Sequence, residues 1–476
     1  MFSGRRMLPA TKAAVAGALG LGAGVLGAGT VASAAEPTQQ ELLEQIKALQ
    51  AKVEQLESRQ NSQAAQTQPA ATQPQEQGAT VDSVLRDAER RSDPLMLQGG
   101  SGVTAGYNKG KFVIQDEAGN FVLHPQLHFA PRFAVSNRDD AKHNGSDKST
   151  ESGFEIRRLK LGFDGNVFTP NLTYLFLWAT DRNSGNLQLE EAWAKYAFPT
   201  GALHNFYVKG GQFKDPFAHE GLTSSKRLLA AERSLLNDVF TGGDNFVQGA
   251  AVGWDDGPEG SPFRAEVAYT DGANGANQNF QDFPTTKANF GVAGRVEYLA
   301  FGKWSEYEDW TTIGNTEDML AFGAGVDLTE AGDTDTLLHT LDVQYERGRL
   351  GLFAAYMGRS IEDATVGTGA DATNHNGYDW GFIAQAAYLM DNRLEPFVRY
   401  DYINFDKDLL PAGTDENKVH EFTVGANYYF KGHNAKFTAD VTYLPNGTPV
   451  ADTGADILAS DGEREFVFRA QFQLLL

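Results

Sequence analysis

From about Phe121 to the end of the chain, apolar and polar residues alternate with a period of two. In the last stretch, Phe466, Phe468 and Ala470 alternate with Arg469 and Gln471. Successive side chains of a β-strand point to opposite faces of the sheet, so each such segment predicts a strand with one apolar and one polar face. There are sixteen segments of this kind, near residues 121–136, 153–166, 171–180, 188–198, 205–214, 247–256, 262–271, 287–301, 318–328, 336–347, 348–360, 378–390, 393–405, 419–430, 434–444 and 464–476.

The connections between these segments fall into two classes. Short turns join four of the pairs, at residues 167–171, 347–348, 391–392 and 431–434. Longer polar loops mostly alternate with them, at 137–152, 215–246, 272–286, 361–377, 406–418 and 445–463. An even number of strands, with short turns at one end and long loops at the other, is typical of outer-membrane barrels. The exception is 302–317, which is long where this pattern predicts a short turn.

A soluble β-sandwich shows the same alternation, with its apolar faces turned inward. Two features favour a membrane barrel instead. Aromatic residues crowd the ends of segments, as at Tyr400, Tyr402 and Tyr428, and the final segment is apolar to its end; aromatic belts at the two interfaces are typical of membrane barrels. We therefore predict an all-β fold, a 16-stranded antiparallel transmembrane β-barrel over residues 121–476, preceded by a short N-terminal coiled-coil helix. A barrel of this size encloses an aqueous channel.

The N-terminus has the pattern of an export signal. Arg5, Arg6 and Lys12 precede an uncharged run rich in Ala, Gly, Leu and Val. The run ends in Ala32, Ser33 and Ala34, an A-x-A cleavage pattern. Residues 1–34 are therefore predicted to be a cleaved secretory signal peptide.

A heptad stripe follows the signal sequence. Its apolar residues are spaced four and three apart, which predicts a coiled-coil segment over residues 35–59 built on Leu42, Ile46, Leu49, Val53 and Leu56. An amphipathic helix packed on its own protein fits the same short stripe. Residues 60–80 form a Gln/Ala/Pro linker that is too poor in apolar residues to fold. Residues 81–120 are expected to hold a short amphipathic helix and a Gly-rich lead-in to the barrel.

Composition limits the classes of function. The 476 residues include 40 Lys and Arg against 62 Asp and Glu, a formal net charge of −22, which argues against a nucleic-acid partner. The absence of cysteine excludes disulfides, a thiol nucleophile and Cys-ligated metal. A mean hydropathy of −0.38 excludes a polytopic helical membrane protein. Much of the acid lies in loops 361–377 and 445–463, which we place at the outer rim.

The sequence contains no convincing catalytic set. His124 and His128 are four residues apart but on a strand, whereas the metal pair of this spacing requires a helix. Glu190 and Glu191 are adjacent, so alternation places them on opposite faces of their strand. There is no G-x-S-x-G motif and no phosphate-binding Gly loop. We predict no enzyme activity, no cofactor and no metal site.

The third long loop, residues 215–246, carries the most informative charges. It holds three cations, and two more lie on the strand before it. Cationic side chains in a low-dielectric constriction lower the barrier for anions. Five acids share the loop, however, and salt bridges that pin it to the barrel wall explain these charges equally well. The loop and strand cations are Lys226, Arg227, Arg233, Lys209 and Lys214.

Several runs carry a family resemblance. They are G-G-Q-F-K-D-P-F at 210–217, L-T-S-S at 222–225, A-E-R-S at 231–234 and E-E-A-W-A-K-Y-A-F at 190–198. They resemble the phosphate-selective porin O and P family of trimeric outer-membrane channels, over roughly residues 121–476. The resemblance implies anion selection by a lysine cluster at the constriction and an arginine ladder along the wall. The candidates for lining the pore are Lys209, Lys214, Lys226, Arg227, Arg233, Arg132, Arg158, Lys160, Arg295 and Arg399.

Taken together, these patterns predict a passive outer-membrane diffusion channel for small hydrophilic solutes, anions such as phosphate among them, with loop 215–246 as its constriction. Its expected surroundings are outer-membrane lipid and two further copies of itself in a homotrimer. The alternative is a structural anchor that tethers the envelope, with residues 41–91 reaching the cell wall. A deletion of residues 36–98 distinguishes them, because only a tether needs that segment to hold the envelope together.

Overall fold

The computed structural model describes residues 102–108, 111–139, 149–255, 261–279, 288–367, 372–391, 393–411, 413–414, 416–450, 454–458 and 462–476. The predicted signal peptide, coiled-coil segment and linker, and the tether built on them, lie outside these residues and stay predictions. Within this part of the chain, no helix is both long and apolar enough to cross a membrane.

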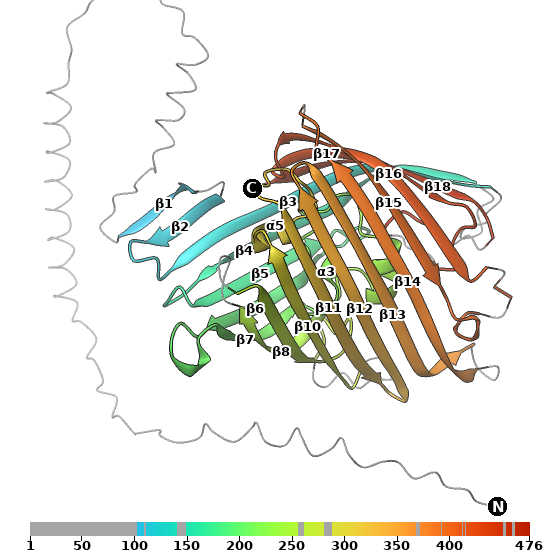
Figure 1. The fold of residues 1–476 in the computed structure, drawn as a ribbon, viewed down its shortest axis with the longest axis horizontal. Helices are drawn as coiled ribbons and strands as arrows, with labels where there is room; N and C mark the ends of the chain where they lie inside the picture. The colour runs from blue at the N-terminus through green and yellow to red at the C-terminus, as the bar shows by residue number, and fades with distance from the viewer. Residues whose placement is uncertain are drawn as a thin grey trace, which may run out of the picture. The chain divides into compact units, whose positions relative to one another are not determined.

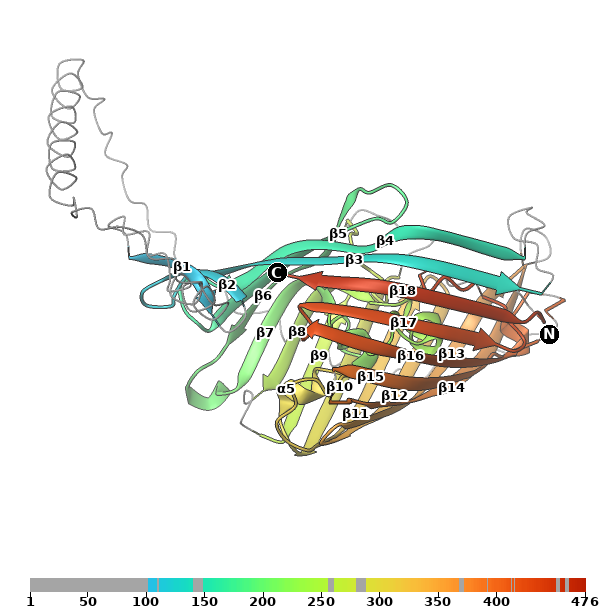
Figure 2. The same cartoon turned by 90° about the horizontal axis from the view of Figure 1, so that it is seen from above.

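Sixteen antiparallel strands, β3 to β18, form a closed sheet (Figures 1 and 2). Each pairs with the next, and β18 pairs back to β3, from Glu465 opposite Arg138 to Leu475 opposite His128. Closure lets each strand find backbone partners on both sides, as a membrane interior requires. The strands are Val122–Arg138 (β3), Thr150–Asn166 (β4), Leu172–Thr180 (β5), Leu187–Ala197 (β6), Phe206–Lys214 (β7), Phe246–Asp255 (β8), Phe263–Thr270 (β9), Phe290–Phe301 (β10), Met319–Ala331 (β11), Thr334–Arg347 (β12), Leu350–Val366 (β13), Thr373–Tyr388 (β14), Leu394–Asn404 (β15), Lys418–Lys431 (β16), Ala435–Leu444 (β17) and Glu465–Leu475 (β18).

The prediction of a 16-stranded antiparallel barrel is confirmed, and each predicted segment coincides with one strand. The two faces have the polarity of a membrane barrel. In β18, Phe466 and Phe468 are exposed on the outer wall, whereas Arg469 and Gln471 are buried inside. A soluble sandwich buries its apolar face, so this inverted burial excludes that alternative.

A hairpin precedes the barrel in a stretch for which the sequence predicted only a Gly-rich lead-in. It consists of β1 (Val103–Asn108) and β2 (Lys111–Asp116). Strand β2 extends the sheet by pairing Ile114 with Leu123 and Gln115 with Val122 at the start of β3. Its alternation was too short to be read as a strand pair from the sequence.

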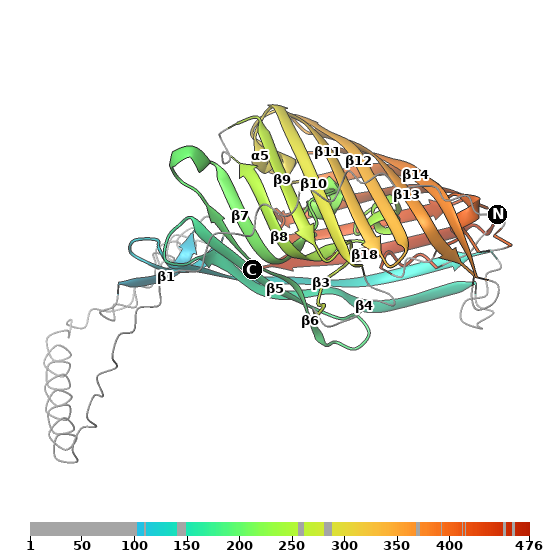
Figure 3. The ribbon, with the colours of Figure 1, turned by 90° about the horizontal axis from the view of Figure 1, so that it is seen from below.

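The loop between β7 and β8 folds into the barrel, carrying helices α3 (His219–Leu222) and α4 (Leu235–Thr241) (Figures 1 and 3). Its apolar side chains, among them Phe217 and Leu236, are buried in one cluster with inward-facing wall residues of β12 to β18. Glycines on the wall make room for it. A Cβ at Gly325 would lie 2.2 Å from the Phe217 carbonyl oxygen, and one at Gly381 would lie 2.4 Å from a Leu236 methyl group.

The long turn between β10 and β11, the exception in the loop pattern, folds inward from the opposite end. It contains α5 (Trp304–Tyr307), and Trp304, Tyr307 and Trp310 are buried. The Tyr307 ring stacks on His219 of the β7–β8 loop with centroids 3.9 Å apart. The backbone N–H of Trp310 donates to the carbonyl of Arg227 in the same loop. The turn is therefore long because it forms a second inward element that supports the first. The remaining short helices, η1 (Gly201–Leu203) and η3 (Lys407–Leu409), lie in connections.

Candidate functional site

Two cavities flank the β7–β8 loop inside the barrel. The one at the end of the long loops has a volume of about 640 Å³, and its lining includes Arg157, Arg233 and Asp244. The one at the end of the short turns has a volume of about 880 Å³, and its lining includes Thr223 and Lys226. Among the described residues, none lines both cavities. The loop therefore lies between the two cavities, and we call the part of it that separates them the partition.

The partition is built around the carboxylate of Asp244, on which three cations converge. Its Oδ1 lies 2.6 Å from Nη2 of Arg233 and 3.6 Å from Nζ of Lys214, and its Oδ2 lies 3.7 Å from Nζ of Lys160. Arg233 and Lys214 also donate to the carbonyl of Thr223, at 2.8 and 3.1 Å. These bonds join the lining of one cavity to that of the other. Burial by itself would raise the pKa of Asp244, but Arg233, Lys160 and Lys214 outweigh it and hold that pKa well below its usual range.

A second ion cluster holds the tip of the loop to β3 and β4. The carboxylate of Glu232 accepts from Arg132, from Nε of Arg157 at 2.6 Å and from Nη2 of Arg158 at 2.5 Å. Burial by itself would raise the pKa of Glu232, but the three guanidinium groups outweigh it and keep the pKa well below its usual range. Glu232 is therefore ionised at neutral pH and is the shared counter-ion of three arginines.

A β-bulge explains how two consecutive arginines reach the same carboxylate. The β3–β4 register passes from Ala130 opposite Arg158 to Pro131 opposite Ile156, which leaves Arg157 as an extra residue. An extra residue re-aims a strand, so Arg157 and Arg158 both turn inward. Proline cannot donate to the ladder and is found at bulges, so Pro131 was a signal that the sequence reasoning missed.

A second bulge, in β6, corrects the prediction for Glu190 and Glu191. The β5–β6 register passes from Leu177 opposite Glu191 to Trp178 opposite Leu189, which leaves Glu190 as the extra residue. Glu190 bonds Nζ of the inward-facing Lys160 at 2.6 Å, and Glu191 follows it on the same face. The opposite-face prediction was wrong because it assumed unbroken alternation. Two adjacent charges in a membrane strand signal a bulge, since unbroken alternation would place one of them on the lipid face, where charged side chains are destabilising.

The five predicted wall cations all contact the β7–β8 loop. Arg132, Arg158 and Lys160 bond its carboxylates, as described above. Nη1 of Arg295 donates to the carbonyl of Phe217 at 3.0 Å, and Nη1 of Arg399 donates to the carbonyl of Glu232 at 3.0 Å. Each is also paired with acids of the wall, Arg295 with Asp342 and Glu297 and Arg399 with Glu421 and Asp401.

The other five predicted residues divide by location. Arg233 and Lys214 lie in the partition. Lys226 donates to the side-chain oxygen of Gln126 on β3, and both Lys226 and Arg227 line the cavity at the turn end. Lys209 lies on β7 and bonds Glu266 at 2.6 Å; its Nζ also lies 4.2 Å from the centre of the Phe213 ring. Which of the ten line the conducting path stays a prediction.

One acid that we placed at the outer rim lies inside the channel. Asp456, from the connection between β17 and β18, bonds Nη1 of Arg132 at 2.7 Å. Ala455 and Ile457, on either side of it, are buried with the apolar side chains of the β7–β8 loop, a contact that local sequence does not encode. In the described residues, no three His, Cys, Asp or Glu side chains are grouped so as to hold a metal ion.

Comparison with known proteins matches this geometry to one family. The family model described as phosphate-selective porin O and P matches residues 137–449, about two thirds of the chain. The chain belongs to this family. As a member of this porin family, the chain is an outer-membrane diffusion channel, and the family is one of channels rather than enzymes.

Individual proteins similar to this porin are distant in sequence. An uncharacterized protein of Aquifex aeolicus (strain VF5) is 24% identical over 359 residues, covering 68% of this chain and 83% of that protein. The solved structure of an anion-selective porin from Comamonas acidovorans is 14% identical, covers 74% of this chain and 99% of that one, and has a TM-score of 0.51. It shares the fold. The structure of Salmonella typhi OmpF, at 12% identity and a TM-score of 0.48, covers 75% of this chain and 99% of that one.

Proposed function

We propose that this porin conducts small anions, phosphate among them, in preference to cations, and transports them without catalysing a reaction. The observation that carries the proposal is the convergence of Lys160, Lys214 and Arg233 on Asp244 in the partition between the two cavities. Three cations around one carboxylate produce a local electrostatic field that favours a negative charge at this position. A permeating oxyanion offers the same kind of acceptor atoms to the same donors.

The balance of charges around the partition supports a preference for anions over cations. The ion pairs there join seven cations, Lys160, Lys214, Arg233, Arg132, Arg157, Arg158 and Arg182, to five carboxylates, Glu190, Asp244, Glu232, Glu155 and Asp456. Among these paired groups the cations exceed the carboxylates by two, although the whole chain carries −22. Much of that acid lies on other parts of the chain, and charges beyond a Debye length of about 8 Å are screened.

The test is the reversal potential of the purified porin in a planar bilayer with a KCl gradient. We expect a potential of the sign that marks chloride as the more permeant ion, and a fall in chloride current when phosphate is added, because the two anions compete for the same cations. A potential of the opposite sign overturns the proposal. If chloride is preferred but phosphate does not reduce its current, the channel conducts anions and phosphate is not one of the ions that bind in it.

The anion preference is expected to fall between pH 7 and pH 9. Burial lowers the pKa of Lys226 to about 8. The carboxylate of Asp164 opposes this shift, whereas the nearby cations Lys160, Lys111 and Arg227 add to it. A lysine is charged below its pKa, so this cation is present at pH 7 and is largely lost at pH 9. Lys226→Arg keeps its charge throughout, since arginine stays protonated. Reversal potentials at the two pH values check this; an equal change in the porin and in Lys226→Arg contradicts it.

We also infer a homotrimer, as the family resemblance implies. The outer wall carries a hollow of about 870 Å³ whose apolar lining includes Phe133, Phe154 and Ile156. The Phe154 side chain is 88% exposed. We expect Phe154→Lys to raise the monomer fraction measured by light scattering in detergent, because it places a charge in an apolar interface. Phe466→Lys, outside the hollow on the same wall, is the control; equal effects of both argue against this interface.

A further inference from the structure

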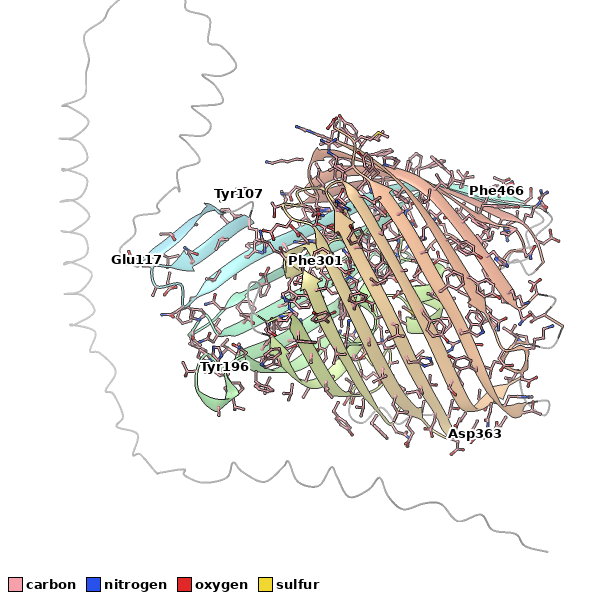
Figure 4. All side chains as sticks on the ribbon, viewed as in Figure 1. Tyr107, Glu117, Tyr196, Phe301, Asp363 and Phe466 are labelled. Carbon is pink, nitrogen blue, oxygen red and sulfur yellow. The ribbon has the colours of Figure 1, made fainter. Side chains whose placement is uncertain are left out.

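The β1–β2 hairpin has two unlike faces. Residues paired across an antiparallel ladder point to the same side. The pairs Tyr107 with Phe112 and Ala105 with Ile114 therefore share one face with Val103 and its partner Asp116, whose carboxylate accepts from the backbone N–H of Phe121. This apolar face is exposed: Tyr107 is 57% and Phe112 is 45% exposed. Figure 4 shows Tyr107 on β1, the strand of the hairpin that β2 separates from β3. The other face carries Thr104, Gly106, Val113 and Gln115, which are half-buried.

The hairpin continues the wall of the barrel. Strand β18 pairs with β3 as far as His128, and below that point β2 takes the same edge of β3 at Leu123 and Val122. Lys111, at the start of β2, lines the turn-end cavity together with the C-terminal Leu476. The hairpin thus lies at the rim of the short-turn end, next to the first strand (Figure 2).

Its apolar face is continuous with the outer surface of the barrel. Ile114 and Leu123 are paired, so they point to the same side, and Leu123 is one of the exposed apolar residues of the outer wall. Phe121 and Phe168, whose ring centroids are 5.4 Å apart, stand beside them on the same rim and are exposed. Aromatic residues at this level are typical of the interfacial girdle of a membrane barrel.

We propose that the hairpin is a membrane-contacting extension of the barrel, whose Tyr107, Phe112 and Ile114 face lies in the headgroup region of the periplasmic leaflet. Three observations carry this: an exposed aromatic face that is apolar apart from Asp116 at its β3 end, an opposite face that is half-buried, and continuity with the lipid-facing wall. The partner is phospholipid. The inference is independent of ion selectivity, because this face points away from the channel.

The experiment uses the absence of cysteine in the chain. Tyr107→Cys and Phe112→Cys are made separately in the full chain and labelled with an environment-sensitive fluorophore. Val113→Cys, on the other face of the same strand, is the matched control. Each protein is placed in phospholipid nanodiscs with and without acyl-brominated lipid, and then titrated with iodide. A heat-induced mobility shift on gels confirms that each variant is folded; if Phe112→Cys fails to fold, Tyr107→Cys carries the same test.

Lipid contact predicts several-fold stronger quenching by brominated lipid at positions 107 and 112 than at 113, and the reverse order for iodide. Equal iodide quenching at all three positions shows a face in water and overturns the proposal. Probes at 107 and 112 that are shielded from both quenchers show a face covered by protein, and this outcome also overturns it. Energy transfer between differently labelled protomers then identifies a second copy as the cover.

Discussion

Replacing Glu232 by glutamine is expected to loosen the β7–β8 loop inside the barrel. The substitution keeps the shape of the side chain but removes the shared counter-ion of Arg132, Arg157 and Arg158. Removing one partner of a buried ion pair costs about 3 kcal/mol or more, because the remaining charge is left unpaired. Three kcal/mol corresponds to about a hundredfold in the equilibrium between docked and undocked loop. This cluster holds the tip of the loop. The backbone amides of the loop are therefore expected to exchange their hydrogens about a hundredfold faster in the variant.

Hydrogen exchange measured by mass spectrometry on peptides from residues 219–241 checks this result. Glu362→Gln removes the same charge from an exposed end of β13 and is expected to leave exchange unchanged. Acid is a second route to the same loss. Because the pKa of Glu232 is depressed in the folded state, its contribution is present above the unfolded pKa near 4.5 and is lost only as pH falls through the depressed value. Loop exchange that is unchanged in Glu232→Gln means that the apolar cluster, and not the ion cluster, docks the loop.

Replacing Asp244 by asparagine is expected to increase the preference for anions strongly. The variant leaves Lys160, Lys214 and Arg233 at the partition without the carboxylate on which they converge. Two unit charges 4 Å apart interact by about 4 kcal/mol at an effective dielectric constant near 20. Water in the two adjoining cavities screens part of this. If about 1.4 kcal/mol remains, the anion-to-cation permeability ratio changes on the order of tenfold.

Reversal potentials in the same KCl gradient measure this change. The control is Asp333→Asn, which neutralises an exposed acid in the connection between β11 and β12. Arg233→Gln, which removes a cation from the same cluster, is expected to move the potential in the opposite direction. A potential that moves toward cations in Asp244→Asn contradicts the proposed role of this cluster, and an unchanged one places the conducting path elsewhere.

The sequence was sufficient to predict the strands because a membrane barrel obeys one strong rule. The outer wall contacts lipid, which favours apolar side chains, so every second residue of a strand is apolar and marks its outward face. Strand β18 shows this pattern from Phe466 to its end. The rule fails where a strand gains an extra residue. Arg157 and Glu190 are such extra residues. At each bulge, two consecutive charged side chains therefore face the inside of the barrel. A strict alternation of faces assumes that no strand contains a bulge. For that reason Glu190 and Glu191 were predicted to lie on opposite faces.

The candidate site was predicted by residue type but not by pairing. All ten predicted cations were read from the loop and from alternating wall positions, and five of them, from β3, β4, β10 and β15, meet one loop. Their partners came from elsewhere. Salt bridges from the acids of the loop to the wall were predicted as an alternative, but the sequence did not indicate that Glu232 and Asp244 form them, and Asp456 was assigned to the rim. Tyr307 lies in a turn that the pattern marked only as too long.

By itself, then, the sequence determined the export signal pattern, the number and order of the strands, the polarity of the wall and the family. These depend on local periodicity and on short motifs, which need no knowledge of distant contacts. The tertiary structure alone decided that the β7–β8 loop docks on the wall through apolar packing, that three arginines share Glu232, and that three cations share Asp244. These pairings join residues up to hundreds of positions apart, and only the closed barrel brings them together.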